Sequence, residues 1–210
     1  MAKIVSVKGL FKLRYKLLSI GGVWRLVIGS PEIGGAWLVY GHEKNGKTAV
    51  SVNIADELAN LKRTLYVSAE EGLSSEIREN CRLQGIDPNR KNLQFADFLT
   101  IDDLRELLIK RQGPKFVIID NITVYVDELR NNRVRKLLAE FPGVTFIFIA
   151  HEERNEPYTA TARMIKKLAK VIIHVQGFKA FVSGRCPGGE INIAPNLAAL
   201  YHGTEQKTSN

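Results

Sequence analysis

Two glycines frame a lysine–threonine pair immediately after an apolar run in this chain. The stretch reads GHEKNGKT over residues 41–48, and it follows the run AWLVY of residues 36–40. A buried strand, a loop G-x-x-x-x-G-K-T and a helix are together typical of a phosphate-binding loop, whose main-chain N–H groups surround phosphate oxygens. The amino end of the following helix adds partial positive charge. The residues predicted to contact a nucleotide are Gly41, His42, Glu43, Lys44, Asn45, Gly46, Lys47, Thr48 and Ala49.

Three side chains would act on a triphosphate and its magnesium ion. Lys47 is predicted to neutralise charge on the outer phosphates, and the Thr48 hydroxyl is predicted to ligate Mg²⁺. Asp120 ends the apolar run that starts at residue 116, so its carboxylate belongs at the tip of a parallel strand, where it would hold the metal through water. The alternative for residues 41–48 is a glycine-rich turn capped by threonine, but the flanking strand and helix fall where nucleotide binding requires them. ATP and Mg²⁺ are therefore expected in this site.

Hydrolysis also needs a carboxylate that orients the attacking water. The residue after Asp120 is Asn121, which carries no acid group, so the carboxylate has to come from another strand. Glu70 and Glu71 follow the strand-like run TLYVS of residues 64–68. We predict that Glu70 orients the water and that Glu71 supports it or caps the next helix. The alternative is that both carboxylates lie in the first turn of that helix and complement its dipole.

Strand-like and helix-like segments alternate along the chain. Strands are predicted at residues 36–40, 64–68, 92–96, 116–120 and 144–150, and helices at residues 47–61, 73–85, 101–111, 132–141 and 161–169. The runs VIIHV and KAFVSGR then predict a closing hairpin around Gln176 and Gly177. Continuous apolar runs such as VTFIFIA are typical of central strands buried on both faces. The pattern predicts an α/β fold with a central, mostly parallel sheet, helices on both faces and a C-terminal β-hairpin.

The composition is that of one globular domain. Of 210 residues, 45% are hydrophobic and 25% are charged, and 30 basic against 22 acidic side chains give a net charge of +8. This charge favours a polyanionic partner such as nucleic acid without establishing one. Cys81 and Cys186 lack the spacing of a disulfide framework or a zinc site, which predicts a reduced, cytoplasmic protein. No apolar run has the length of a membrane span and no secretion signal is apparent, so no membrane partner is expected.

Four segments together resemble the RecA-type ATPase core. They are GHEKNGKT, LYVSAEEGLSSEIRENCRLQGI, KFVIIDNITVY and FIFIAHEER, and the resemblance extends over about residues 36–190. The second segment is most similar to the RadA and KaiC branch, and Glu43 in the loop is similar to RecA itself. The resemblance implies Mg²⁺-dependent ATP hydrolysis in which Glu70 acts on the attacking water. It also implies that His151, at the tip of a later strand, senses the γ-phosphate, with a capped strand end as the alternative.

The resemblance further implies assembly into a homo-oligomeric ring or filament with ATP between neighbouring protomers. A basic finger of one protomer would then complete the site of the next. Arg185 matches the arginine of this finger in the run FKAFVSGRCPGGE, but the lysine expected two residues earlier is Ser183. Lys179 is the candidate substitute. A solvated turn residue is the alternative interpretation of Arg185.

In the recombinases of this family, two loops line the DNA axis, and their counterparts here are about residues 126–135 and 152–161. Arginines in these loops would bind backbone phosphates of single-stranded DNA, and a tyrosine would stack on a base. The predicted DNA-binding residues are Arg130, Arg133, Arg135, Arg154 and Tyr158. Glu152, Glu153 and Glu156 in the second loop argue against a phosphate channel, and a solvated helix face is the alternative for the arginines. The next helix adds the basic residues Arg163, Lys166, Lys167 and Lys170.

The chain is expected to divide into a basic N-terminal arm of residues 1–35, a RecA-like core of residues 36–202 and a loose polar tail of residues 203–210. The arm has no acidic residue before Glu32 and would pack on a neighbouring protomer, contact DNA or cover the edge of the sheet. No further domain of the larger family members is apparent. The chain therefore resembles short phage or mobile-element recombination ATPases.

Two functions from different classes remain open. The first is a Mg²⁺-dependent ATPase that acts on single-stranded DNA in recombination, repair or replication. The second is a KaiC-like regulatory or scaffold ATPase whose nucleotide state controls protein partners without DNA. The net charge and the arginine-rich segment favour the first function, and the acids of the second loop favour the second. A small-molecule kinase is less favoured because no lid-like, arginine-rich insertion follows the strands.

Overall fold

The computed structural model describes residues 4–202, so the predicted tail of residues 203–210 lies outside the described part. The strands are β1 (Gly35–Gly41), β2 (Thr64–Ser68), β3 (Leu93–Ala96), β4 (Phe116–Asp120), β5 (Thr145–Glu153), β6 (Glu156–Pro157), β7 (Val171–Gln176), β8 (Lys179–Gly184) and β9 (Gly189–Asn192). The helices are α1 (Val7–Phe11), α2 (Trp24–Ile28), α3 (Lys47–Leu61), α4 (Ser75–Leu83), α5 (Ile101–Ile109), the 3₁₀ helix η1 (Ile122–Tyr125), α6 (Val126–Leu129), α7 (Arg133–Glu140), α8 (Ala160–Leu168) and α9 (Pro195–His202).

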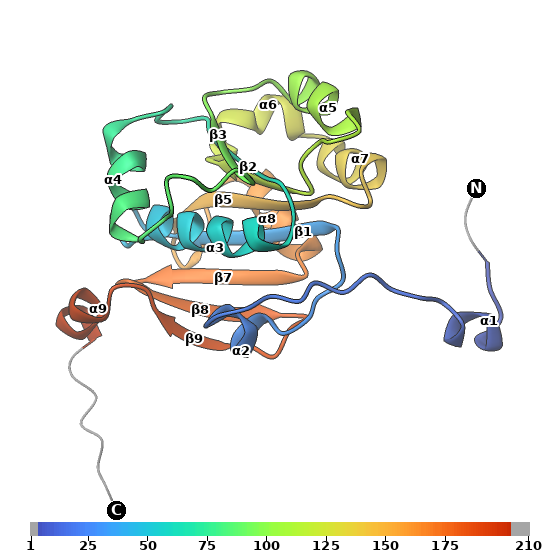
Figure 1. Cartoon of the computed structure of the whole chain (residues 1–210), viewed down its shortest axis with the longest axis horizontal. Coiled ribbons are helices and arrows are strands. Elements are labelled where there is room, and N and C mark those ends of the chain that lie inside the picture. Colours follow the sequence, from blue (N-terminus) through green and yellow to red (C-terminus); the bar gives the residue numbers. More distant parts are fainter. Residues whose placement is uncertain (1–3, 203–210) are drawn as a thin grey trace, which may run out of the picture.

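One sheet runs through the middle of the molecule (Figure 1). Its strand order is β3-β2-β4-β5-β1-β7-β8-β9, with β6 paired to β5 outside this path. The strands from β3 to β7 are parallel, and β8 and β9 are antiparallel additions at one edge. The carboxyl ends of β1, β2, β4 and β5 therefore meet at the same end of the sheet. The predicted α/β fold with a mostly parallel sheet is confirmed.

Alternate side chains of the central strands face two separate cores. Trp37 and Val39 of β1 face one core with α2, α3 and α4, whereas Leu38 and Tyr40 face the other with α5, α6, α7 and α8. Each of these four side chains is at most 6% exposed. Because both faces of the sheet are covered, its central strands are continuously apolar and not alternating, as the sequence indicated. The rigid centre of the sheet fixes the positions of the strand tips.

The C-terminal antiparallel part is larger than predicted. The predicted hairpin is present as β7 and β8, which turn at Gly177 and Phe178. The third strand, β9, was missed because its GEIN stretch is only four residues long and begins within the glycine pair of residues 188–189. Helix α9 was also missed. It returns to the turn between β7 and β8, where the His202 imidazole hydrogen-bonds the Gln176 carbonyl oxygen at 3.0 Å.

The two helices of the described N-terminal segment, α1 and α2, differ in how they pack against the rest of the molecule. Helix α1 buries none of its residues and stands apart from the body of the molecule (Figure 1). Helix α2 instead contacts β8 and β9, and its Trp24 is 1% exposed with Nε1 donating to Asn53 Oδ1 at 2.7 Å. Residues around α2 thus cover the sheet next to its antiparallel edge. Within residues 4–202, no helix combines the length and the apolar character that crossing a membrane would require.

The segment after β5 differs from the predicted loop. β5 continues through Glu153, turns at Arg154 and Asn155, and pairs with β6. The expectation that residues 152–161 form a loop facing solvent was wrong for Glu152, whose side chain is 2% exposed. The longer strand carries Glu152 into the fold, where its carboxylate lies 2.7 Å from His174 Nε2.

Candidate active site

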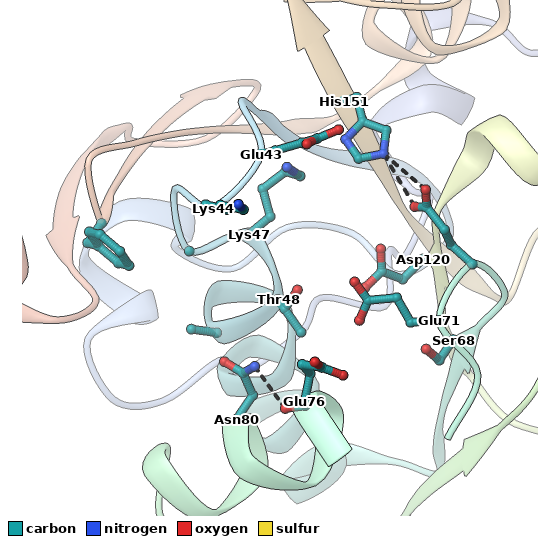
Figure 2. Close-up of a pocket in the computed structure, with 14 residues that line it drawn as sticks. Glu43, Lys44, Lys47, Thr48, Ser68, Glu71, Glu76, Asn80, Asp120 and His151 are labelled. Carbon is teal, nitrogen blue, oxygen red and sulfur yellow. Dashed lines mark hydrogen bonds and ion pairs between the residues drawn. The ribbon is translucent and has the colours of Figure 1, made fainter. Parts of the chain in front are cut away.

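A cavity of about 540 Å³ opens where β1, β2, β4 and β5 end. Figure 2 shows the loop before α3 on one side of it and the tips of β2, β4 and β5 on the other. Helix α4 and the turn between β7 and β8 complete the wall. The lining residues are Glu43, Lys44, Gly46, Lys47, Thr48, Ala49, Ser68, Glu70, Glu71, Glu76, Asn80, Asp120, His151 and Phe178. Residues predicted from four separate segments thus share one cavity.

The two glycines of the GHEKNGKT stretch are required for different reasons. A Cβ atom on Gly41 would lie 2.2 Å from the main-chain oxygen of Val175, so the loop starts in direct backbone contact with β7. Gly46 has a φ of 96°, and a Cβ atom there would also lie 3.0 Å from the Phe178 ring. A left-handed residue just before α3 turns the chain so that the helix amino end faces the cavity.

Lys47 is held inside the loop that precedes it. Its ammonium group donates a hydrogen bond to the main-chain oxygen of His42 at 2.8 Å. Burial lowers the pKa of Lys47, and the nearby carboxylates of Asp120 and Glu43 oppose this effect. A buried cation that is only partly compensated creates a positive potential where a phosphate anion would be stabilised.

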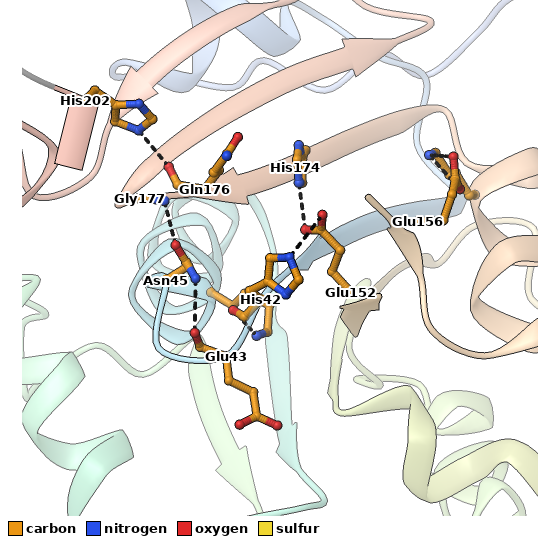
Figure 3. A network of polar contacts seen from close by, with 11 residues as sticks. His42, Glu43, Asn45, Glu152, Glu156, His174, Gln176, Gly177 and His202 are labelled. Carbon is orange, nitrogen blue, oxygen red and sulfur yellow. Dashed lines mark hydrogen bonds and ion pairs between the residues drawn. The ribbon is translucent and has the colours of Figure 1, made fainter. Parts of the chain in front are cut away.

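Three of the nine predicted loop residues face away from the cavity. Gly41 contacts β7, as described above. The His42 side chain turns toward Glu152, and the Asn45 side chain accepts a hydrogen bond from the Gly177 amide at 2.7 Å (Figure 3). These residues attach the loop to its surroundings, whereas the other six line the cavity.

Asp120 lies deep in the cavity beside the Tyr66 hydroxyl, which donates to Asp120 Oδ2 at 2.5 Å. The pKa of Asp120 is raised to about 6, chiefly by burial and also by the carboxylates of Glu71 and Glu70, whereas the hydrogen bond from Tyr66 and the charge of Lys47 oppose this rise. A carboxylate with a raised pKa is stabilised in its charged form when a cation binds next to it.

The donor set at this point fits a magnesium ion. Thr48 offers a hydroxyl oxygen and Asp120 a carboxylate oxygen to the same cavity (Figure 2). Mg²⁺ is held in nucleotide sites by few protein oxygens, together with water and substrate phosphates. The two predicted metal-binding residues thus line the same cavity.

Glu70 is held by two side chains from neighbouring strands. Asn121 Nδ2 donates to Glu70 Oε2 at 3.0 Å, and His151 Nε2 lies 3.3 Å from the same oxygen. Asn121 is itself fixed, because it is buried and its Oδ1 accepts from the Thr123 amide at the start of η1. Glu71 also lines the cavity. The structure therefore gives the Glu70 carboxylate a defined orientation.

His151 contacts the predicted catalytic carboxylate from the tip of β5. Its Nε2 faces both oxygens of Glu70, at 3.4 and 3.3 Å. Its Nδ1 is buried and has no hydrogen-bond partner within residues 4–202. An imidazole that lines the cavity and contacts Glu70 is positioned to respond to a group that enters there.

Arg185 does not reach this cavity. It follows β8, and its amide donates to the Lys170 main-chain oxygen at the far end of the sheet. β8 starts at Lys179 near the cavity and runs away from it for six residues, about 20 Å at the usual rise per residue. An action of Arg185 on a nucleotide would therefore require a nucleotide held by another copy of the chain.

The predicted DNA-binding residues are exposed but do not form one surface. Arg130 forms an ion pair with Asp127 at 3.3 Å, and Arg154 occupies the turn between β5 and β6. Arg135 lines an open hollow of about 620 Å³ between α7 and α8. The other residues of this hollow are Glu156, Ala160, Arg163, Met164, Lys166 and Lys167. Arg133 and the half-exposed Tyr158 lie outside it.

Many solved structures resemble this chain, and two of them are a KaiC-like protein and a flagellar accessory protein. The KaiC-like protein PH0186 from the hyperthermophilic archaeon Pyrococcus horikoshii OT3 is 20% identical, with a TM-score of 0.57 over 84% of this chain and 93% of that one. The flagellar accessory protein FlaH from Methanocaldococcus jannaschii is 16% identical, with a TM-score of 0.61 over 85% and 92%. This chain has a RecA-like fold. No protein-family model matches the sequence, and no curated protein matches it significantly.

The RecA-like fold brings residues to the cavity that the sequence did not reveal. Phe178 reaches it because the hairpin turn folds back onto the phosphate-binding loop, where the Phe178 amide donates to the Asn45 main-chain oxygen. Asn121, next to Asp120, was considered only as the absence of an acid. A polar residue directly after a strand-end aspartate is the signal that could have identified it. Glu76 and Asn80 come from α4, whose orientation no local pattern predicts.

Proposed function

We propose that this protein is a Mg²⁺-dependent ATPase. The observation that carries the proposal is the Glu70 carboxylate, which Asn121 and His151 hold across the cavity from Lys47. A phosphate-binding loop alone would support nucleotide binding. A fixed carboxylate facing that loop adds a group that can orient water, and the RecA-like fold of the two similar structures is consistent with this chemistry.

In the proposed reaction, Glu70 accepts a hydrogen bond from a water molecule and directs the water oxygen to the γ-phosphorus of ATP. The new phosphorus–oxygen bond forms as the bond to the β,γ-bridging oxygen breaks; ADP carries away the bonding electron pair, and the proton lost by the water passes to the Glu70 carboxylate and from there to solvent. Lys47 stabilises the negative charge on the transferring phosphoryl group. His151 and Asn121 keep Glu70 in the orientation that the attack requires.

Thr48 and Asp120 would hold the magnesium ion, Thr48 by its hydroxyl and Asp120 by its carboxylate. When bound, Mg²⁺ supplies positive charge that neutralises the phosphate oxygens and helps to orient them. Tyr66 keeps the Asp120 carboxylate turned toward the cavity by donating to Oδ2.

The pKa of Asp120 gives a pH dependence that tests the metal site. Because burial raises this pKa to about 6, the carboxylate is charged above that pH and protonated below it. Mg²⁺ must then displace a proton, so the Mg²⁺ concentration for half-maximal turnover should rise up to about tenfold for each pH unit below the pKa. Steady-state turnover against Mg²⁺ concentration at several pH values measures this.

The Tyr66→Phe variant is the matched control for this dependence. It removes a hydrogen bond that lowers the pKa of Asp120, so the pH dependence should move to higher pH. A Mg²⁺ requirement that is the same at every pH, or that is unaffected by Tyr66→Phe, would contradict the assignment of Asp120.

As the finer part of the proposal, we propose that the ATPase acts on single-stranded DNA. The support is the hollow between α7 and α8, where Arg135 from one predicted segment lies with Arg163 and Lys167 from another. Of the acids that argued against DNA in the sequence, Glu152 is buried away from the hollow, and Glu156 lies in the hollow but is paired with Lys166 at 2.9 Å. Cations that converge from two helices suit a phosphate backbone.

Single-stranded DNA should stimulate ATP turnover, and added salt should weaken the stimulation. An Arg135→Gln, Lys167→Gln double variant should lose most of the stimulation and keep the turnover without DNA. Arg111→Gln is the matched control, since this exposed arginine lies outside the hollow. Turnover that ignores DNA at low salt would exclude this part of the proposal and favour the KaiC-like alternative, in which the nucleotide state controls protein partners.

We also propose that the chain works as a homo-oligomer in which Arg185 completes the site of a neighbour. Its position at the far end of β8 from the cavity supports an action on another copy. Lys179, the candidate substitute for the missing lysine, lies at the cavity end of the same strand and pairs with Glu190 at 3.1 Å. This pairing leaves Arg185 as the finger residue of the proposal.

A further inference from the structure

The end of β5 carries a buried carboxylate that the proposed mechanism does not use. Glu152 is adjacent to His151, but its side chain points to the opposite face of the strand and is 2% exposed. A buried carboxylate is costly unless its oxygens are hydrogen-bonded. The free-energy cost of burying the Glu152 carboxylate must therefore be offset by contacts with neighbouring polar groups.

Those contacts cross the strand that leads into the phosphate-binding loop. β1 lies between β5 and β7 in the sheet, and Glu152 reaches from β5 to His174 of β7, with His174 Nε2 at 2.7 Å from Oε2. The other oxygen, Oε1, lies 3.7 Å from His42 Nε2, a distance at which the two groups form an ion pair when His42 is protonated (Figure 3). One carboxylate thus connects three neighbouring strand ends, and His42 is the first residue after β1.

A stacked pair of rings, Tyr40 and His174, holds the imidazole in this arrangement. Tyr40, the register partner of His174, stacks on its imidazole with ring centroids 4.6 Å apart and planes 16° apart. On the face of the sheet that α8 covers, the ammonium group of Lys166 lies 4.9 Å from the centre of the Tyr40 ring. These contacts restrict the rotation of His174, so its Nε2 remains directed at Glu152.

His42 links this network to the nucleotide site. Its main-chain oxygen accepts the hydrogen bond from the Lys47 ammonium at 2.8 Å, and its side chain faces Glu152. A shift of the His42 side chain would rotate the carbonyl group on which Lys47 depends. Small displacements of a residue that supports a binding site weaken ligand binding even where the residues that contact the ligand are unchanged.

We propose that Glu152 is a positioning residue of the phosphate-binding loop: together with His174 it clamps His42 and so fixes the carbonyl group that orients Lys47. This inference rests on the proposed function, because it assigns a role within the same site. It also explains why a chain of +8 net charge places an acid at this strand end. Glu152 touches no predicted reacting group and is proposed to act through His42, while its charge also opposes the lowering of the Lys47 pKa by burial.

The test compares Glu152→Gln and His174→Phe with the unchanged chain. His174→Phe keeps a ring to stack on Tyr40 and removes the nitrogen that faces Glu152. Because the clamp supports ground-state binding, each variant should raise the dissociation constant and KM for ATP about tenfold while kcat changes less than about threefold. The double variant should lose no more affinity than the stronger single variant, since the two residues act as a unit.

Glu153→Gln is the matched control, because Glu153 is exposed, directly follows Glu152 and lies outside this network. The ATP affinity of the Glu153→Gln variant should equal that of the unchanged chain. If Glu152→Gln fails to fold, His174→Phe and His42→Ala carry the test, as both side chains are partly exposed. Folded variants that bind ATP as the unchanged chain does would overturn the inference. An unchanged chain that binds no ATP would instead overturn the proposed function, so the two failures are distinct.

Discussion

A Glu70→Gln variant should bind ATP with unchanged affinity and hydrolyse it at least about 100-fold more slowly. The amide keeps the size of the side chain and can still contact Asn121 and His151, so the cavity should keep its shape. It cannot accept a proton or orient water as the carboxylate does. Equilibrium binding of a fluorescent ATP analogue, followed by single-turnover hydrolysis, separates the two effects.

Glu71→Gln is the matched comparison for this variant. Glu71 lines the same cavity and carries the same charge, but the contacts from Asn121 and His151 go to Glu70. Its hydrolysis rate should fall less than about tenfold, through the lost charge near the metal site. If Glu71→Gln stops hydrolysis and Glu70→Gln does not, the two roles are reversed. If neither does, the water-orienting carboxylate is elsewhere.

The sequence predicted the parts of this fold that local physics determines. Apolar runs of five to seven residues predicted the central strands, and the G-x-x-x-x-G-K-T spacing of residues 41–48 predicted the phosphate-binding loop, because each depends on a short segment. The parallel order of the strands followed from their alternation with helices. Glu70 and Asp120 came together as expected, since the Glu70 amide donates to the Asp120 main-chain oxygen at 3.3 Å.

The remaining parts of the site depend on contacts between distant segments. Phe178 enters the cavity only because the turn between β7 and β8 bonds to Asn45, more than 130 positions earlier. Glu152 was interpreted as an acid in an exposed loop, and only the sheet order, with β1 between β5 and β7, shows its partners. No pattern within one segment contains this information. The sequence thus identified groups that could act on a nucleotide, and the structure showed which residues position them.

We expect Lys47 to have opposite effects on stability and on nucleotide binding. Burial lowers the pKa of Lys47, which means that its charged form is penalised in the folded chain. At pH 7 the ammonium is charged in the unfolded chain, so folding has to bury that charge, and this cost persists at every pH below the folded-state pKa. A residue that destabilises the fold by itself is retained where its charge is needed for a ligand.

A Lys47→Ala variant should therefore lose ATP binding without losing stability. Without nucleotide, its Tm should equal or exceed that of the unchanged chain, because the buried charge is gone. Mg²⁺-ATP at about 100 times its dissociation constant should stabilise the unchanged chain by about 2.7 kcal/mol and the variant hardly at all. Thermal unfolding with and without Mg²⁺-ATP measures both effects in one experiment.

Lys62→Ala, an exposed lysine that caps the other end of α3, is the matched control and should keep the full ATP-dependent shift in Tm. A Lys47→Ala chain that unfolds at a much lower temperature without nucleotide would show that the lysine supports the fold. A Lys47→Ala chain that keeps the ATP-dependent shift in Tm would show that the GHEKNGKT loop does not bind a triphosphate. Only the loss of the shift in a stable variant fits a lysine whose burial is offset when a phosphate arrives.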